Sequence, residues 1–149
     1  MTRTKSAVIV FVVLAGAVVT ALSLDYTDTY VAGRFAKALD ARRFEPGVPF
    51  SLDAFLEYYD WEGVCVCASP DDCPGLRGRL GMRYTPAAAD DTWSLVFVKS
   101  YYVVAEIPVR REVLDIPPTL SGRCFERWAA IAEISDTDKG RLFTFVDHN

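Results

Sequence analysis

Histidine is almost missing from this chain of 149 residues, because the single copy, His148, lies one residue before the end. Nucleophilic serine, threonine and cysteine residues depend on an adjacent base, which is most often histidine. The four cysteines also lack the Cys-x-x-Cys spacing that is typical of thiol oxidoreductases. The sequence therefore argues against an enzyme, and it predicts no catalytic, cofactor-binding or metal-binding residue.

Acidic residues outnumber basic ones in most of the chain. Arg3 and Lys5 are the only charged residues among the first 24, so the remaining 125 residues hold 14 basic residues against all 20 acidic ones, a formal net charge of −6. Nucleic acids and anionic lipid headgroups bind proteins through Lys and Arg side chains, which neutralise their charge. This acidic composition argues against nucleic acid as a partner.

One long apolar run extends from Ala7 to Leu24 and contains neither charge nor proline. A helix of roughly 18 residues is about 27 Å long, which is close to the thickness of the hydrocarbon core of a bilayer. Arg3 and Lys5 precede the run and Asp25 follows it, so the positive-inside rule leaves the N-terminus in the cytoplasm. The run predicts a single-pass signal anchor in a bacterial inner membrane, with the lipid bilayer as a partner and a C-terminal domain in the periplasm.

A cleaved signal peptide is the alternative interpretation of the same run. Ala21-Leu22-Ser23 places small residues at the two positions that signal peptidase reads. The apolar core of a signal peptide usually has about 7–15 residues, which is shorter than this run and favours the retained anchor. Cleavage would release a periplasmic protein that binds a small ligand or a soft metal.

Three parts follow from these patterns. Residues 1–24 are expected to form a cytoplasmic tip and a transmembrane or signal-anchor helix, residues 25–48 a juxtamembrane amphipathic helix and linker, and residues 49–149 an exported α+β domain. Apolar residues recur at three-to-four spacing between Tyr26 and Arg43, which is the period of a helix. Pro46 and Gly47 mark its end.

The exported part predicts a mostly antiparallel sheet with two or three helices. Apolar and β-branched runs predict strands at Trp61–Ala68, Trp93–Val98 and Tyr101–Val109, the last two forming a hairpin. Short helices are expected at Leu52–Tyr59, with Ser51 as its N-cap, and at Leu76–Gly81.

The segment from Arg123 to Ile134 fits either a helix or a strand. We favour a strand that forms a closing hairpin with Leu142–Val146, with the polar residues 135–140 as its turn. This hairpin is expected to extend the edge of the same sheet.

The pattern resembles that of small membrane-anchored bacterial proteins to which no activity is assigned. In that group a tryptophan and an acidic residue lead into an apolar strand that ends near a proline, and a later strand pair follows. The residues that carry the resemblance are Phe50, Phe55, Trp61-Glu62-Gly63-Val64, Cys65, Val66, Pro70, Leu80-Gly81, Leu95-Val96-Phe97-Val98 and Val103-Val104. Lys99-Ser100 departs from the glycine-containing turn that joins the later strand pair in that group, and Ala68-Ser69 departs from the aromatic-proline ending of its first strand. The resemblance covers roughly residues 50–109 and implies a bacterial source and a fold, but no activity.

The four cysteines predict at least one disulfide, because an exported domain lies in an oxidising compartment. Cys65 and Cys67 are alternate residues of one strand, whose parallel side chains do not approach each other as a bridge requires. Cys67 and Cys73 are the favoured pair, since a turn-rich loop separates them. Cys65 and Cys124 then form a second disulfide or remain buried thiols. A soft-metal site formed by the cysteines as thiolates is the alternative.

Adjacent aromatic residues are the remaining candidates for function. Tyr58, Tyr59, Tyr101 and Tyr102 place rings on both sides of their elements, so some rings should remain exposed and contact a partner. Packing around the core explains the same residues without a partner. The sequence therefore predicts a membrane-anchored envelope domain that acts as a protein-interaction or structural module, with an envelope protein of unknown identity as its partner.

Overall fold

The computed structural model describes residues 30–57, 59–71, 73–80 and 84–146. The predicted anchor Ala7–Leu24, Tyr58 and His148 lie outside these residues. Within the described parts, no helix is long and apolar enough to cross a membrane.

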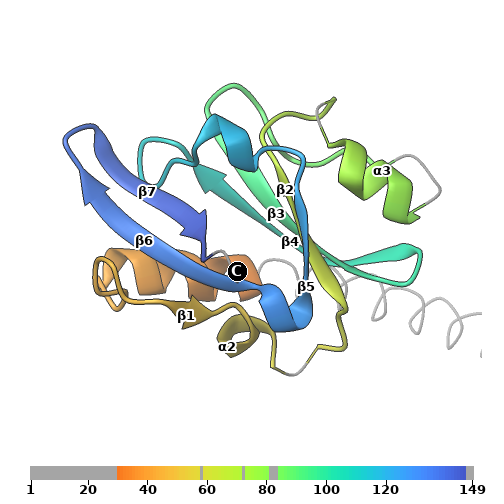
Figure 1. Cartoon of the computed structure of the whole chain (residues 1–149), viewed down its shortest axis with the longest axis horizontal. Helices are drawn as coiled ribbons and strands as arrows, with labels where there is room; N and C mark the ends of the chain where they lie inside the picture. The colour runs from red at the N-terminus through yellow and green to blue at the C-terminus, as the bar shows by residue number, and fades with distance from the viewer. Residues whose placement is uncertain (1–29, 58, 72, 81–83, 147–149) are drawn as a thin grey trace, which may run out of the picture.

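Two antiparallel sheets and three α-helices make up the described structure, which confirms the α+β class (Figure 1). One helix occupies residues 30–40 and is called the N-terminal helix here. The short sheet has the order β1-β6-β7, and the larger sheet has the order β4-β3-β2-β5. The remaining elements are β1 Phe50–Ser51, α2 Asp53–Leu56, β2 Gly63–Cys67, α3 Pro74–Leu80, β3 Thr92–Lys99, β4 Tyr102–Arg110, β5 Cys124–Glu126, β6 Ile131–Thr137 and β7 Gly140–Phe145, with the 3-10 turns η1 Pro118–Leu120 and η2 Arg127–Ala129.

Strands β2 and β3 are buried on both faces, which explains their nearly continuous apolar sequences. One face contributes Val64 and Leu95 to the main core, which also contains apolar residues of β6, β7 and the N-terminal helix. The opposite face contributes Cys65 and Val96 to a smaller core under α3. The four-stranded sheet is therefore the middle layer of the domain.

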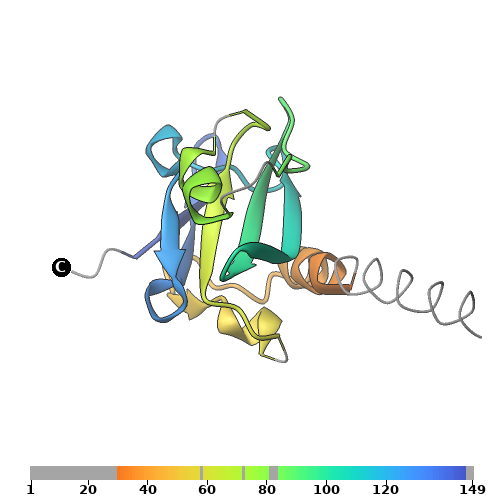
Figure 2. The ribbon, with the colours of Figure 1, turned by 90° about the vertical axis from the view of Figure 1, so that its right-hand side faces the viewer.

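The N-terminal helix packs into the main core through its apolar stripe. Val31, Phe35 and Leu39 are buried there, while Lys37 and Asp40 on the other side are exposed. Figure 2 shows this helix beside the β4 edge of the larger sheet. Its described part is thus a structural component of the folded domain.

The C-terminal hairpin differs from the expectation. Residues 131–137 and 140–145 do pair as β6 and β7, but they join β1 in a separate sheet instead of extending the larger one. The larger sheet is extended by β5, in which Cys124 lies opposite Cys65 of β2. The segment 123–134 is neither one helix nor one strand, because the turn η2 separates β5 from β6. This break lets consecutive strands enter different sheets.

The predicted helix at Leu52–Tyr59 is also shorter than expected. Only residues 53–56 are helical, and Ser51 belongs to β1. The Ser51 hydroxyl still accepts a hydrogen bond from the Asp53 N–H at 3.2 Å. Ser51 therefore supports the entry into the helix from outside the N-cap position, which Leu52 occupies.

Candidate functional site: the aromatic end of the four-stranded sheet

Strand register brings four chain segments to one end of the larger sheet. Gly63, the first residue of β2, pairs with Val98 near the end of β3 and with Glu126 at the end of β5. The turn that joins β3 to β4 and the turn η2 therefore flank Glu62, the residue before β2. We call this region, with Tyr101, Tyr102 and Trp128, the aromatic end.

Glu62 holds the two turns in place. Its Oε2 accepts a hydrogen bond from the Ser100 N–H at 3.0 Å, and its carbonyl accepts one from the Arg127 N–H at 2.8 Å. Ser100 has a φ of 50°, in the left-handed region that non-glycine residues rarely enter. The contact with Glu62 and an ion pair between Lys99 and Asp60 hold this unusual turn. The strained backbone presents Tyr101 at the tip of the hairpin.

Arg127 fixes the other turn to the core. Its Nε donates to Asp53 Oδ1 at 2.8 Å, and its Nη1 donates to the Trp61 carbonyl at 3.2 Å. The guanidinium also lies over the Trp61 ring, 5.2 Å from its centroid. Trp128 is the next residue, so the contacts of Arg127 with Asp53 and Trp61 hold the backbone beside it in place.

Three aromatic side chains at this end are strongly exposed. Tyr101 is 75% exposed, Tyr102 56% and Trp128 76%. Side chains of this kind are enriched at the centres of binding interfaces, where they bury large areas at a small entropy cost. Three exposed aromatic side chains, each with a hydrogen-bonding group, therefore lie at one end of the larger sheet.

Some of the aromatic residues that the sequence predicts to be exposed lie at the aromatic end. Tyr101 and Tyr102 lie on it, whereas Tyr59 is partly buried against the main core. The sequence does not predict the exposure of Trp128, because the segment from Arg123 to Ile134 fits either a helix or a strand. Its exposure depends on the turn η2, and no local sequence signal marks that turn.

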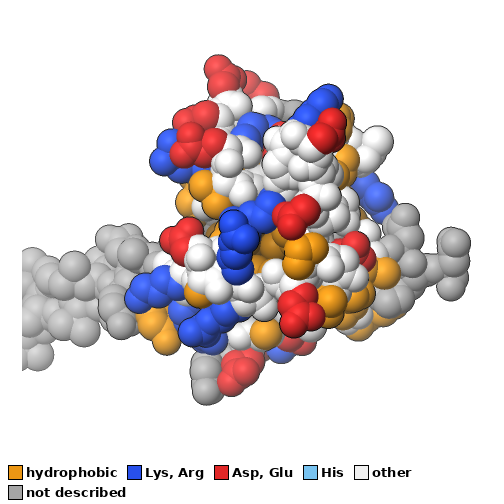
Figure 3. All heavy atoms as spheres, turned by 90° about the vertical axis from the view of Figure 1, so that its left-hand side faces the viewer, with side chains coloured by type: hydrophobic (Ala, Val, Ile, Leu, Met, Phe, Trp, Pro, Cys, Tyr) orange, Lys and Arg blue, Asp and Glu red, His pale blue; other side chains and the backbone are white. Residues whose placement is uncertain are grey.

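The opposite side of the molecule has a different character. Figure 3 shows Lys and Arg side chains interspersed with Asp and Glu side chains, with only small hydrophobic areas between them. Mixed charges of this kind are typical of a solvated surface. The contrast singles out the aromatic end as the candidate site.

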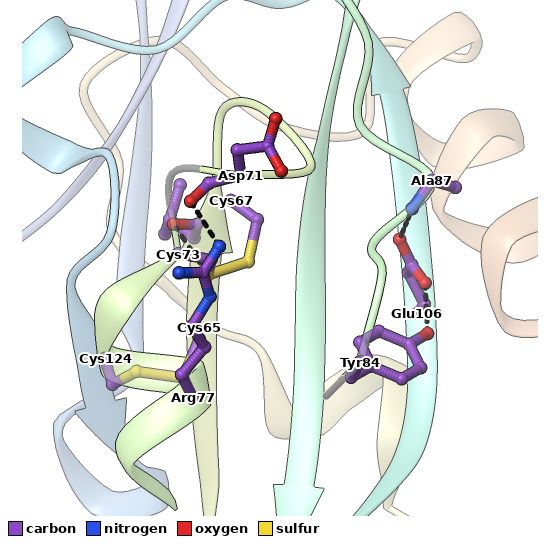
Figure 4. Close-up of a disulfide and its surroundings, with 10 residues drawn as sticks. Cys65, Cys67, Asp71, Cys73, Arg77, Tyr84, Ala87, Glu106 and Cys124 are labelled. Carbon is purple, nitrogen blue, oxygen red and sulfur yellow. Dashed lines mark hydrogen bonds between the residues drawn. A yellow bond between two sulfur atoms is a disulfide. The ribbon is translucent and has the colours of Figure 1, made fainter. Parts of the chain in front are cut away.

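Two disulfides lie beneath α3 (Figure 4). The structure joins Cys67 to Cys73 and Cys65 to Cys124, and the sulfurs pack with Leu76 of α3. A Cβ atom on Gly75 would lie 2.7 Å from Cys124 Sγ, so the first turn of α3 approaches this bond closely. The expected disulfide bonding is confirmed: one bond joins β2 to β5, and the other joins β2 to the residue that precedes α3.

Removing the Cys67–Cys73 disulfide, which closes the shorter of the two loops, is expected to lower the stability of the fold modestly. The bond closes a loop with a sequence separation of 6. Loop-closure entropy for this length corresponds to about 2–2.5 kcal/mol. Cys67→Ala combined with Cys73→Ala should lower the free energy of unfolding in urea by this amount while the circular dichroism spectrum stays native. A loss above about 5 kcal/mol would show that packing beneath α3 outweighs loop closure.

A polar hollow of about 310 Å³ lies beside α3 and is lined by Pro70, Asp71, Arg77, Tyr84 and Thr85. Arg77 Nη2 donates to the Asp71 carbonyl at 2.7 Å. The Tyr84 hydroxyl donates to Glu106, which also accepts the Ala87 N–H at 2.5 Å (Figure 4). These internal bonds connect the surrounding loops, so the hollow is explained by loop packing.

Metal chemistry has no support at the cysteines. All four sulfurs are bound in disulfides, and oxidised cysteines do not act as thiolate ligands. Among the described residues, no group of three or more His, Cys, Asp or Glu side chains is placed to hold a metal ion.

No known protein family matches this chain, and neither a curated protein nor a solved structure is detectably similar to it.

Proposed function

We propose that the chain is a membrane-anchored envelope domain that binds another envelope protein through its aromatic end. The apolar run from Ala7 to Leu24 supports the anchor, with a cytoplasmic N-terminus and a periplasmic domain. Disulfides are typical of exported proteins, so the two bonds agree with this topology. The resemblance to small membrane-anchored bacterial proteins remains a prediction and points the same way.

A single observation carries the binding part of the proposal. Trp128 is 76% exposed although it follows Arg127, whose side chain is bound to Asp53 and to the Trp61 carbonyl. A large aromatic side chain on a supported backbone loses little conformational entropy when it binds. Tyr101 and Tyr102 are also exposed at this end of the sheet, but Trp128 is the residue on which the protein contact depends.

Addition of a partner strand to β4 is less favourable than binding through these side chains. β4 is an edge strand of the larger sheet, but its pairing with β3 is irregular between Phe97 and Val98. Pro108 also lies within β4, and proline cannot donate a backbone hydrogen bond. Both features discourage another strand from pairing with this edge.

A photo-reactive phenylalanine analogue at position 128 tests the proposal in living bacteria that express the full chain. We expect one covalent adduct with an envelope protein, because Trp128 lies at the contact. The same analogue at position 139, in the exposed turn between β6 and β7, should give no such adduct. Trp128→Ala should reduce recovery of that protein about tenfold or more, as for a residue central to an interface.

The control is Val48→Ala, which removes an exposed apolar side chain elsewhere on the domain. It should leave recovery unchanged. Equal recovery with Trp128→Ala and with the unchanged chain would refute the aromatic end as the contact. A chain that begins near Asp25 and is found in the soluble fraction would refute the anchor and favour a released periplasmic protein.

A further inference from the structure

We propose that the tyrosine turn, which consists of residues 99–102 between β3 and β4, lies in the lipid headgroup layer of the anchoring membrane. This inference rests on the anchor in the proposed function, but it assigns a separate role to Tyr101 and Tyr102. The turn positions the domain on the bilayer, and Trp128 remains available to a protein partner.

Chain length places one side of the domain near the bilayer. Only five residues separate Leu24, the end of the apolar run, from Tyr30, the first described residue. Even a fully extended chain spans at most about 3.3–3.6 Å per residue, so Tyr30 lies within roughly 20 Å of the end of the run. Polar headgroups occupy about 5–8 Å of this distance. The side of the domain at which the N-terminal helix begins must therefore face the membrane.

The tyrosine turn lies on that same side. In Figure 1 the described N-terminal helix begins at its right-hand end, and the hairpin of β3 and β4 extends farther to the right. Figure 2, viewed from the right, shows the hairpin tip and the start of the helix facing the viewer. The turn η2 does not extend as far to the right in Figure 1 as the hairpin tip does. The tyrosine turn is thus the part of the aromatic end that reaches toward the bilayer.

The chemistry of the turn suits a membrane interface. Tyrosine combines an apolar ring with a hydroxyl group, and it is enriched where lipid tails meet headgroups. Tyr101 and Tyr102 are among the most exposed large hydrophobic side chains of the described residues, and Tyr30, the first described residue of the helix, is 47% exposed. Contact through tyrosine rings does not depend on basic residues, which are the minority among the charged residues of the domain.

The turn is already held in one conformation before it meets lipid. Glu62 Oε2 binds the Ser100 N–H at 3.0 Å, and Lys99 is paired with Asp60. The left-handed backbone at Ser100 directs the chain sharply back into β4. Insertion of the two rings therefore requires little further ordering of the backbone.

Quenching by brominated lipid tests this placement in the full chain, reconstituted in nanodiscs of phosphatidylcholine. The probe is Tyr101→Trp in a Trp128→Phe background, where Trp61 and Trp93 remain as buried emitters. The matched control is Lys139→Trp in the same background, because residue 139 is exposed in the turn at the far end of Figure 1. The emission added by the tryptophan at position 101 should be quenched by brominated phosphatidylcholine at least about twice as strongly as that added by the tryptophan at position 139. This is the behaviour of a residue in the interfacial aromatic belt.

Each outcome is decisive. Equal quenching at positions 101 and 139, in chain that co-purifies with the nanodiscs, would overturn the lipid contact and leave the anchor intact. Chain that does not remain with the nanodiscs would overturn both the anchor and the inference that rests on it. A residue-101 signal that is shielded only when an envelope protein is added would assign the tyrosine turn to a protein partner instead.

Discussion

Trp61→Ala is expected to lower the free energy of unfolding by about 3–5 kcal/mol, because it removes a large buried side chain from the main core. Trp61 is 1% exposed, and its ring meets Phe97 of β3 edge-to-face with centroids 5.1 Å apart. Within the described residues its Nε1 has no hydrogen-bond partner, so the loss comes from packing and from the contact with Arg127. Urea denaturation followed by circular dichroism measures the change.

Trp128→Ala is the matched control for this prediction. The same residue type lies 76% exposed at the same end of the sheet, so its removal should change stability by less than about 0.5 kcal/mol. The thermal midpoint should fall by more than about 10 °C for Trp61→Ala and stay nearly unchanged for Trp128→Ala. Similar midpoints for the two variants would mean that Trp61 is not a core residue.

Removal of the Cys65–Cys124 disulfide is expected to destabilise the domain more than removal of Cys67–Cys73. The sequence separation is 59 for the first bond and 6 for the second. Loop-closure entropy corresponds to about 4 kcal/mol for the longer loop, against about 2–2.5 kcal/mol for the shorter one. Small domains have total stabilities of about 5–15 kcal/mol. The Cys65–Cys124 disulfide, which closes the longer loop, therefore accounts for a large share of the stability of this one.

Paired alanine substitutions isolate this effect without leaving a free thiol. Cys65→Ala with Cys124→Ala should lower the urea midpoint clearly more than Cys67→Ala with Cys73→Ala does. The two losses of stability can be compared directly, because both cysteine pairs belong to the smaller core beneath α3. Equal losses would show that local packing, and not loop length, determines the contribution of each bond.

The sequence already indicates the α+β class and the position of its central strands. Residues 63–67 and 92–99 are nearly continuous apolar runs, and such runs form strands that are buried on both faces. The hairpin of β3 and β4 follows from two neighbouring β-compatible runs, even though its turn contains no glycine. These features depend on local composition and spacing, which the sequence contains directly.

The candidate site is less accessible to sequence reasoning. Tyr101 and Tyr102 were identified as adjacent aromatics, and both are exposed. The exposure of Trp128 is not apparent from the sequence, because the segment from Arg123 to Ile134 fits either a helix or a strand, and the turn η2 that exposes Trp128 interrupts it. Glu62 and Arg127 support the site through contacts with residues 38 and 74 positions away, respectively.

By itself, the sequence determined the strands that bury both faces, the amphipathic helix before them and the disulfide-forming character of the cysteines. Only the tertiary structure decided that β6 and β7 leave the larger sheet and that β5 takes its edge. It also decided that Cys124 lies opposite Cys65 and that Trp128 is exposed beside the tyrosine turn. The physical reason is that local patterns report which faces of an element are apolar, whereas the choice between two sheets depends on packing among residues far apart in the chain.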